Sequence, residues 1–212
     1  MRHCLVLALA GVLLLSGCAS APSSPDKAGR LGPGGVTMRE DPDLNWVWAA
    51  PGFALLDYDI VYVGETRADV PRLNPDGREN LEWAQGVVRE AFRKALAEST
   101  RLAVVSLESE IPASARLLRL ESTVIEYEKG GGAARFFAGL YGAGQPVIRV
   151  QGVVTPHGTP VLVFEDKRSG TSGTARMFGG YRSDKAIQEE DIKAMAEALT
   201  KVLLRNGRPV QK

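Results

Sequence analysis

Apolar and polar residues alternate along much of the chain, and this period of two predicts β-strands. Four alternating segments and one short apolar segment lie at residues 55–63, 115–128, 146–154, 159–168 and 102–107. The clearest alternation places Leu118, Leu120, Ser122 and Val124 on one side of a strand. A Thr-Pro-His-Gly turn separates residues 146–154 from residues 159–168, so we expect these two strands to form an antiparallel hairpin.

The first of these segments, residues 55–63, reads as a half-buried strand. Its alternation places Leu56, Tyr58, Ile60 and Tyr62 together on one side and aspartates on the other. We therefore expect the side that carries Leu56 and Ile60 to face the core.

Two further segments have apolar residues at the three- to four-residue spacing of amphipathic helices. These are residues 78–97, which follow an Asn-Pro-Asp-Gly turn, and residues 184–205, which Ser183 can cap at the start and Gly207 at the end. Each helix has one apolar stripe, so both can cover the same face of a sheet. We predict an α+β fold with a mainly antiparallel sheet of about five strands and two amphipathic helices on one face.

The N-terminus has the layout of a secretory signal peptide. Arg2 precedes an apolar run of about a dozen residues, which is too short to span a membrane. Leu15-Ser16-Gly17-Cys18 then resembles the lipobox of bacterial lipoproteins. The resemblance implies cleavage before Cys18 and attachment of fatty chains, including palmitate, to this residue. The alternative is an ordinary secreted protein that is cut a few residues later.

The residue after Cys18 is Ala19 and not aspartate, which favours the outer membrane over the inner membrane as the location. Residues 19–35 are rich in Pro, Gly, Ser and Ala and are expected to be flexible. The chain therefore divides into a signal peptide, a lipidated cysteine with a flexible tether, a single α+β periplasmic domain and a tail, at residues 1–17, 18–50, 51–206 and 207–212.

Composition excludes several functions. Cleavage removes Arg2 and leaves 25 Lys and Arg residues against 25 Asp and Glu residues, so no basic excess is present to bind nucleic acid. After cleavage no free thiol remains and His157 is the one imidazole, so we expect no metal site and no cofactor. His157 lies in the Thr-Pro-His-Gly turn and is expected to be exposed rather than catalytic. No phosphate-binding loop is present, so we expect no nucleotide.

Aromatic residues give the candidate interaction sites. Trp46 and Trp48 alternate and share one side of an extended segment, either against the membrane interface or packed on the sheet. Two long glycine-rich stretches, residues 129–146 and 168–183, also contain large apolar side chains. Their possible interaction residues are Phe136, Phe137, Leu140, Tyr141, Phe178 and Tyr181. The alternative is that these side chains complete the core.

Several stretches together resemble a known family. They are the run from Leu117 to Tyr127, the loop RFFAGLYGAG, the hairpin IRVQGVV…VLVFEDKRSG, the glycine-rich link and the last helix. Over about residues 50–205 they resemble the family named domain of unknown function 4410. Its members are described as bacterial lipoproteins, and it has no agreed activity or catalytic residues. The element order also looks like the amino-terminal domain of TolB, at the level of fold alone.

Two functional hypotheses follow. In the first, the chain is a membrane-anchored lipoprotein without enzymatic activity, which binds the bilayer through Cys18 and an envelope protein, or a second copy, through the glycine/aromatic loops. In the second, it is a carboxylate-dependent hydrolase of cell-wall glycan. The acids available for the second hypothesis are Asp57, Asp59, Glu126, Glu128, Glu165 and Asp166.

Overall fold

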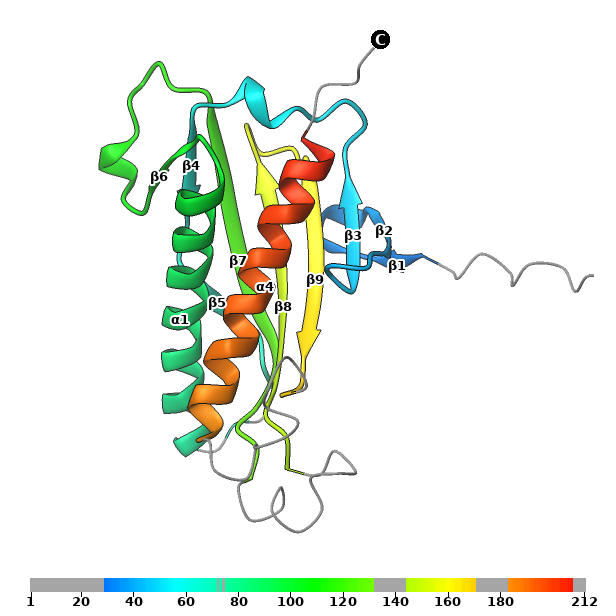
Figure 1. Cartoon of the computed structure of the whole chain (residues 1–212), viewed down its shortest axis with the longest axis vertical. Coiled ribbons are helices and arrows are strands. Elements are labelled where there is room, and N and C mark those ends of the chain that lie inside the picture. Colours follow the sequence, from blue (N-terminus) through cyan, green and yellow to red (C-terminus); the bar gives the residue numbers. More distant parts are fainter. Residues whose placement is uncertain (1–28, 72, 74, 132–143, 171–182, 208–212) are drawn as a thin grey trace, which may run out of the picture.

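A computed structural model describes residues 29–71, 73, 75–131, 144–170 and 183–207 of the chain. These residues form a nine-stranded sheet and two long helices, which both lie on one face of the sheet (Figure 1). The strands are β1 (Arg30–Leu31), β2 (Thr37–Glu40), β3 (Trp46–Ala49), β4 (Ile60–Val63), β5 (Arg67–Ala68), β6 (Ala103–Val105), β7 (Leu117–Glu128), β8 (Val147–Thr155) and β9 (Leu162–Arg168). The long helices are α1 (Pro75–Ser99) and α4 (Asp184–Asn206), and three short 3-10 turns are η1 (Pro33–Gly35), η2 (Leu55–Asp57) and η3 (Glu108–Glu110).

The α+β class is confirmed, but the sheet is larger and more mixed than expected. Its order is β1-β2-β3-β9-β8-β7-β4-β6, and β5 pairs with β7. The pairings β4–β6, β4–β7 and β5–β7 are parallel. The parallel pairs arise because α1 connects β4 and β5 to β6 and β7, and a crossover helix returns the chain in its original direction. The predicted sheet of about five mainly antiparallel strands is therefore corrected.

Three of the additional strands come from residues that precede the predicted domain. Strands β1, β2 and β3 lie between residues 30 and 49, and β3 pairs antiparallel with β9. They thus lie N-terminal to the predicted boundary at residue 51. β1 and β2 pair with neighbouring segments of the chain, and β3 joins all three to the sheet through its remote partner β9.

The predicted helices are confirmed with small shifts at their ends. α1 begins at Pro75 and α4 begins at Asp184. Ser183 caps α4 by accepting a hydrogen bond from the backbone N–H of Ala186 at 3.2 Å. Gly207 ends the helix, and its carbonyl accepts a hydrogen bond from the backbone N–H of Leu55.

The orientation predicted for residues 55–63 is wrong. Val61 and Val63 face the core, whereas Leu56 is 65% exposed. The segment is not one strand, because η2 turns the chain before β4 begins and the backbone N–H of Tyr58 bonds to the carbonyl of Leu55. The turn changes which residues point inward, and the alternation in the sequence does not reveal it.

The main core lies between the two helices and one face of the sheet. Leu118, Leu120 and Val124 of β7 point into it, as the alternation predicts. The ring of Phe92 on α1 meets the ring of Phe164 on β9 edge to face, with centroids 5.9 Å apart. The other face of the sheet has no helix over it in the described part of the chain (Figure 1).

Candidate functional site: a charged cluster on the open sheet face

The helix-free face of the sheet, here called the open face, brings charged side chains of three strands together. Glu126 of β7 lies opposite Arg149 of β8, which lies opposite Lys167 of β9. In the next row, Gln151 lies opposite Glu165, which lies opposite Trp46 of β3. Side chains of directly opposed residues share one face of a sheet, so each row forms a line of neighbours. The open-face cluster is Arg30, Glu126, Arg149, Gln151, Glu165 and Lys167.

A β-bulge in β7 places Glu126 in this cluster. Val124 pairs with Val150, but the next pair joins Glu126 to Arg149, so Ile125 is the extra residue. The extra residue shifts the alternation by one position. As a result Glu126 faces Arg149 while Tyr127 enters the core, where its hydroxyl donates to Gln188 at 3.1 Å.

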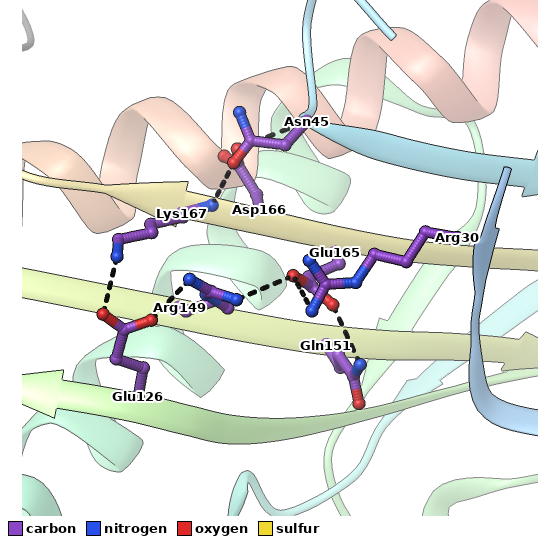
Figure 2. Close-up of polar contacts among 8 residues, drawn as sticks. All are labelled: Arg30, Asn45, Glu126, Arg149, Gln151, Glu165, Asp166 and Lys167. Atoms are coloured by element: carbon purple, nitrogen blue, oxygen red, sulfur yellow. Dashed lines mark hydrogen bonds and ion pairs between the residues drawn. The ribbon is translucent and has the colours of Figure 1, made fainter. Parts of the chain in front are cut away.

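Glu165 is the buried centre of the cluster. Its side chain is 2% exposed, yet it carries a carboxylate with three polar neighbours. The guanidinium Nη2 of Arg30 lies 3.0 Å away, the amide Nε2 of Gln151 lies 3.0 Å away and Nη1 of Arg149 lies 3.5 Å away (Figure 2). A buried carboxylate is costly unless hydrogen bonds and opposite charges surround it, and these groups supply both.

Arg149 links this centre to a second carboxylate. Its Nη2 lies 2.6 Å from Glu126, which also accepts a hydrogen bond from Nζ of Lys167 at 2.6 Å (Figure 2). The ion pairs thus run without a break from Lys167 through Glu126, Arg149 and Glu165 to Arg30. They connect β1, the first described strand, to β7, β8 and β9.

Asp166 belongs to the opposite, helix-covered face. It is fully buried and accepts hydrogen bonds from Nε of Arg168 at 2.6 Å and from the backbone N–H of Asn45 at 3.3 Å. Burial raises the pKa of Asp166 and outweighs the opposing effect of Arg168. The side-chain oxygen of Asn45 accepts a hydrogen bond from the backbone N–H of Lys167, so Asn45 joins the two layers of polar contacts (Figure 2).

A shallow cavity of about 370 Å³ opens beside the cluster. Its described lining consists of Arg30, Glu40, Asp41, Asn45, Trp46, Arg149, Glu165 and Lys167. The lining carries charges of both signs and one indole ring, and it contains no hydroxyl, thiol or imidazole group. It suits hydrogen bonding to a polar ligand and stacking on Trp46, and within the described lining it has no Ser, Thr, Cys or His side chain.

The geometry gives the hydrolase hypothesis no support. A glycosidase holds its substrate between two carboxyl groups. Glu126 and Glu165 share the open face, but the guanidinium of Arg149 lies between them (Figure 2). Asp166 faces the other way. Asp59 is exposed and pairs with Arg116 at 2.6 Å, and the hydrogen bonds from Arg116 lower the pKa of Asp59.

No group of three or more His, Cys, Asp or Glu side chains that could hold a metal ion occurs within the described ranges. Among the same residues, no helix is both long enough and apolar enough to cross a membrane. His157 is exposed in the turn between β8 and β9, where the sequence places it.

The predicted site residues lie outside the described residues. These are Cys18, Phe136, Phe137, Leu140, Tyr141, Phe178 and Tyr181. The described stems of the two glycine/aromatic loops do meet. The backbone N–H of Gly131 bonds to the carbonyl of Gly144 at 2.9 Å, and Gly170 packs against Gln145, Pro146 and Ile187. Both loops therefore leave the fold from neighbouring points at one end of the sheet.

The tryptophan pair lies on the open face, and both rings are partly buried. Trp48 is opposite Val163, which is itself fully buried although no helix covers this face in the described part of the chain. The β1–β2 hairpin supplies cover here: Arg30 reaches Glu165, Gly34 packs near Pro160, and Met38 is fully buried.

Sequence reasoning misses the open-face cluster. It assigns Arg30 to a tether and names the partner of Arg30, Glu165, only among the acids available to the hydrolase hypothesis. One signal is present: Arg149 and Lys167 both occupy polar positions in the two strands of the predicted hairpin. Local alternation predicts which face of a strand a residue occupies. Which charged residues become neighbours depends on the register between strands, and this register is set only when the chain folds.

Comparisons with known proteins show similarity at low levels. No family model and no curated protein matches the chain. Among solved structures, the PelC dodecamer from Paraburkholderia phytofirmans is 18% identical with a TM-score of 0.47, over 72% of this chain and 96% of that chain. A Xanthomonas campestris protein of family DUF330 is 14% identical with a TM-score of 0.43, over 75% of this chain and 90% of that chain.

A protein of Caulobacter crescentus that is provisionally named a lipoprotein is 13% identical with a TM-score of 0.33, over 70% of this chain and 94% of that chain. The structures similar to this chain thus include a member of an uncharacterised family and a lipoprotein-like protein. Similarity at this level does not establish a family or an activity. Membership of domain of unknown function 4410 stays a prediction.

Proposed function

We propose that this protein is a lipid-anchored envelope lipoprotein of the outer membrane, facing the periplasm, and that it acts as a binding or structural module. The lipobox-like sequence that ends at Cys18 provides the anchor, and the resemblance to domain of unknown function 4410 agrees with it. The open-face cluster supports a binding role rather than catalysis, because the carboxylates of Glu126 and Glu165 are both paired with cationic side chains.

The observation that carries this proposal is where the chain enters the fold. β1 begins at Arg30, twelve residues after Cys18. A fully extended chain spans at most about 3.6 Å per residue, so Arg30 lies within about 43 Å of an anchor at Cys18. A domain held at this distance works close to the bilayer surface.

The second part of the proposal concerns the partner. The stems of the two glycine/aromatic loops meet at one end of the sheet, through Gly170, Gln145 and Pro146. We infer that Phe136, Phe137, Leu140, Tyr141, Phe178 and Tyr181 act together there as one apolar contact surface for an envelope protein. Aromatic side chains such as these are enriched at protein interfaces.

The anchor is tested by growing cells with labelled palmitate. We expect the label in the wild-type chain and its loss in Cys18→Ser, which should also leave the membrane fraction. A chain without label, or a Cys18→Ser variant that floats with membranes as the wild type does, would contradict the anchor.

Docking is tested by crosslinking intact envelopes and isolating the chain. The variant Phe136→Ser, Phe137→Ser, Tyr141→Ser should lose the crosslinked protein that the wild type retains. Leu56→Ser is the matched control, because Leu56 is 65% exposed on η2 at the other end of the sheet (Figure 1). Equal recovery by wild type and the triple variant would contradict docking through the loops, and it would leave the anchor unaffected.

A further inference from the structure

The outer side of the helix layer contains a groove that the proposed function does not use. It lies between α1 and α4 and has a volume of about 850 Å³. Its lining residues from α1 include the apolar side chains Trp83, Val87, Ala91 and Ala95, and Ala196 contributes from α4.

The floor of this groove is an extension of the core. Trp83, Val87 and Ala91 are partly buried and pack directly against the core cluster. Gly86, Ala91 and Ala95 have little or no side chain, so another surface can approach the helix backbone closely. Covering this floor would remove apolar surface from water, which favours association.

Charges of alternating sign border the groove on α4. Lys185, Glu189, Lys193, Glu197 and Lys201 are exposed and follow one another at intervals of four residues, so they form a row that winds slowly around the helix. We call this row the α4 ladder. Glu189, Lys193 and Glu197 line the groove. None of these three forms an ion pair or hydrogen bond with another residue that the structure describes.

The other rim of the groove is different, because its charges already have partners. On α1, Glu90 pairs with Arg93 at 2.6 Å and Lys94 lies 4.0 Å from Glu98. At the end of the ladder, the ammonium group of Lys185 lies 5.1 Å from the ring centre of Trp83. Within the described lining, the charges that are available to an incoming surface are therefore Glu189, Lys193 and Glu197.

This ladder is complementary to itself. In a dimer with a two-fold axis, two antiparallel α4 helices place opposite each other residues whose numbers have a constant sum. Opposite charges meet when the axis passes midway between two neighbouring ladder residues, and like charges meet when it passes through one of them. If Glu189 faces the partner's Lys193, then Lys185 faces the partner's Glu197, and every contact joins opposite charges. If Lys193 faces the partner's Glu197, then Glu189 faces the partner's Lys201, and both contacts join opposite charges, whereas Lys185 then faces the partner's Arg205. A parallel two-fold pair would instead place each residue opposite its own copy, so like charges would meet.

We propose that a second copy of this chain covers the groove, with the two α4 helices antiparallel across a two-fold axis. The apolar floors supply the area that is removed from water, and the ladders fix the register. This interface is on the helix layer and uses none of the residues of the proposed loop contact surface, so it stands independently of the proposed function.

The test measures self-association of the full chain in detergent by sedimentation equilibrium. We expect a reversible dimer for the wild type. Lys193→Glu reverses the charge of one residue. It alters two contacts across the interface, because each copy contributes residue 193 once. The dissociation constant of the dimer should therefore rise about tenfold or more. Glu121→Lys is the control: this residue is exposed on the open face and should leave the dimer unchanged.

Two double variants then test the register. In the first register, where Glu189 faces the partner's Lys193, the double variant Glu189→Lys, Lys193→Glu still joins opposite charges. In the second register, where Lys193 faces the partner's Glu197, the same variant places like charges together. The double variant Lys193→Glu, Glu197→Lys joins opposite charges in the second register and places like charges together in the first. One of the two double variants should recover wild-type association. A monomeric wild type, a Lys193→Glu variant that associates as well as wild type, or failure of both double variants to recover would each overturn the proposal. Circular dichroism confirms that each variant is folded.

Discussion

Gly152 of β8 lies directly opposite Phe164 of β9, and the ring of Phe164 fills the space that a side chain at residue 152 would need. A Cβ atom at this position would lie 2.1 Å from the ring. The ring has little room to move, because it is fully buried and meets Phe92 edge to face. The glycine is therefore required by the packing of the core.

Gly152→Ala should lower the free energy of unfolding by about 1–3 kcal/mol, which is typical of an overfilled core. Urea unfolding followed by circular dichroism measures it. Gly86→Ala is the matched control in dilute, monomeric protein, since a Cβ atom added at residue 86 on α1 would meet no neighbouring segment within 4 Å. The control should be neutral or stabilise the protein by up to about 1 kcal/mol, because alanine favours helix over glycine. Equal effects of the two changes would contradict this account of Phe164.

Glu165→Gln tests the centre of the open-face cluster. The change removes the negative charge between Arg30 and Arg149 and leaves two guanidinium groups facing a neutral amide. We expect the free energy of unfolding to fall by about 1–3 kcal/mol, less than for a pair that is buried on both sides, because Arg30 is 38% exposed. Glu121→Gln on the same face should change it by less than about 0.5 kcal/mol. A neutral Glu165→Gln would show that the cluster contributes little to stability.

Asp166 gives a prediction on pH. Burial raises its pKa in the folded state above the unfolded value of about 3.9, so the folded protein binds the proton more tightly than the unfolded chain does. Stability from this group is therefore present at low pH and is lost as the pH rises through the raised pKa. Asp166→Asn removes the effect. The stability of wild type relative to Asp166→Asn should fall between about pH 4 and the raised pKa, and a rise over this range would contradict the assigned direction.

Ser183→Ala removes the cap of α4. The hydroxyl oxygen of Ser183 accepts a hydrogen bond from the backbone N–H of Ala186, and alanine cannot replace it. We expect a loss of about 1 kcal/mol in the free energy of unfolding. Ser183→Asp should retain most of the stability, because a carboxylate can accept the same bond and also interacts favourably with the helix N-terminus. An equal loss in both variants would show that the cap is not the cause.

Part of the fold follows from the sequence, and the reason differs between elements. In β7, alternation and tertiary packing agree, so the sequence correctly assigns Leu118, Leu120 and Val124 to the core. In α4, the apolar stripe and the cap Ser183 act locally, so the sequence locates the helix within a residue. The β8–β9 hairpin is also predictable, because its turn sequence is local.

The errors occur where distant parts of the chain decide the structure. The turn η2 changes which residues of the segment 55–63 point toward the core, and the local pattern of apolar residues does not indicate this turn. β3 lies in a segment that is assigned to the tether, although its tryptophans alternate as in an extended strand, and it pairs with β9. The same limit applies to the candidate site, since Arg30 and Glu165 are far apart in the sequence and meet only when the hairpin folds over the open face.

The contact between Arg30 and Glu165 also determines how mechanical load would travel through a chain that is tethered at Cys18. Tension on the tether would reach β1 first, and β1 itself is held by two backbone-paired positions on β2. The guanidinium of Arg30 transfers part of that tension to β9, in the middle of the sheet. The first strand would then peel away from the molecule only after this charged link had broken.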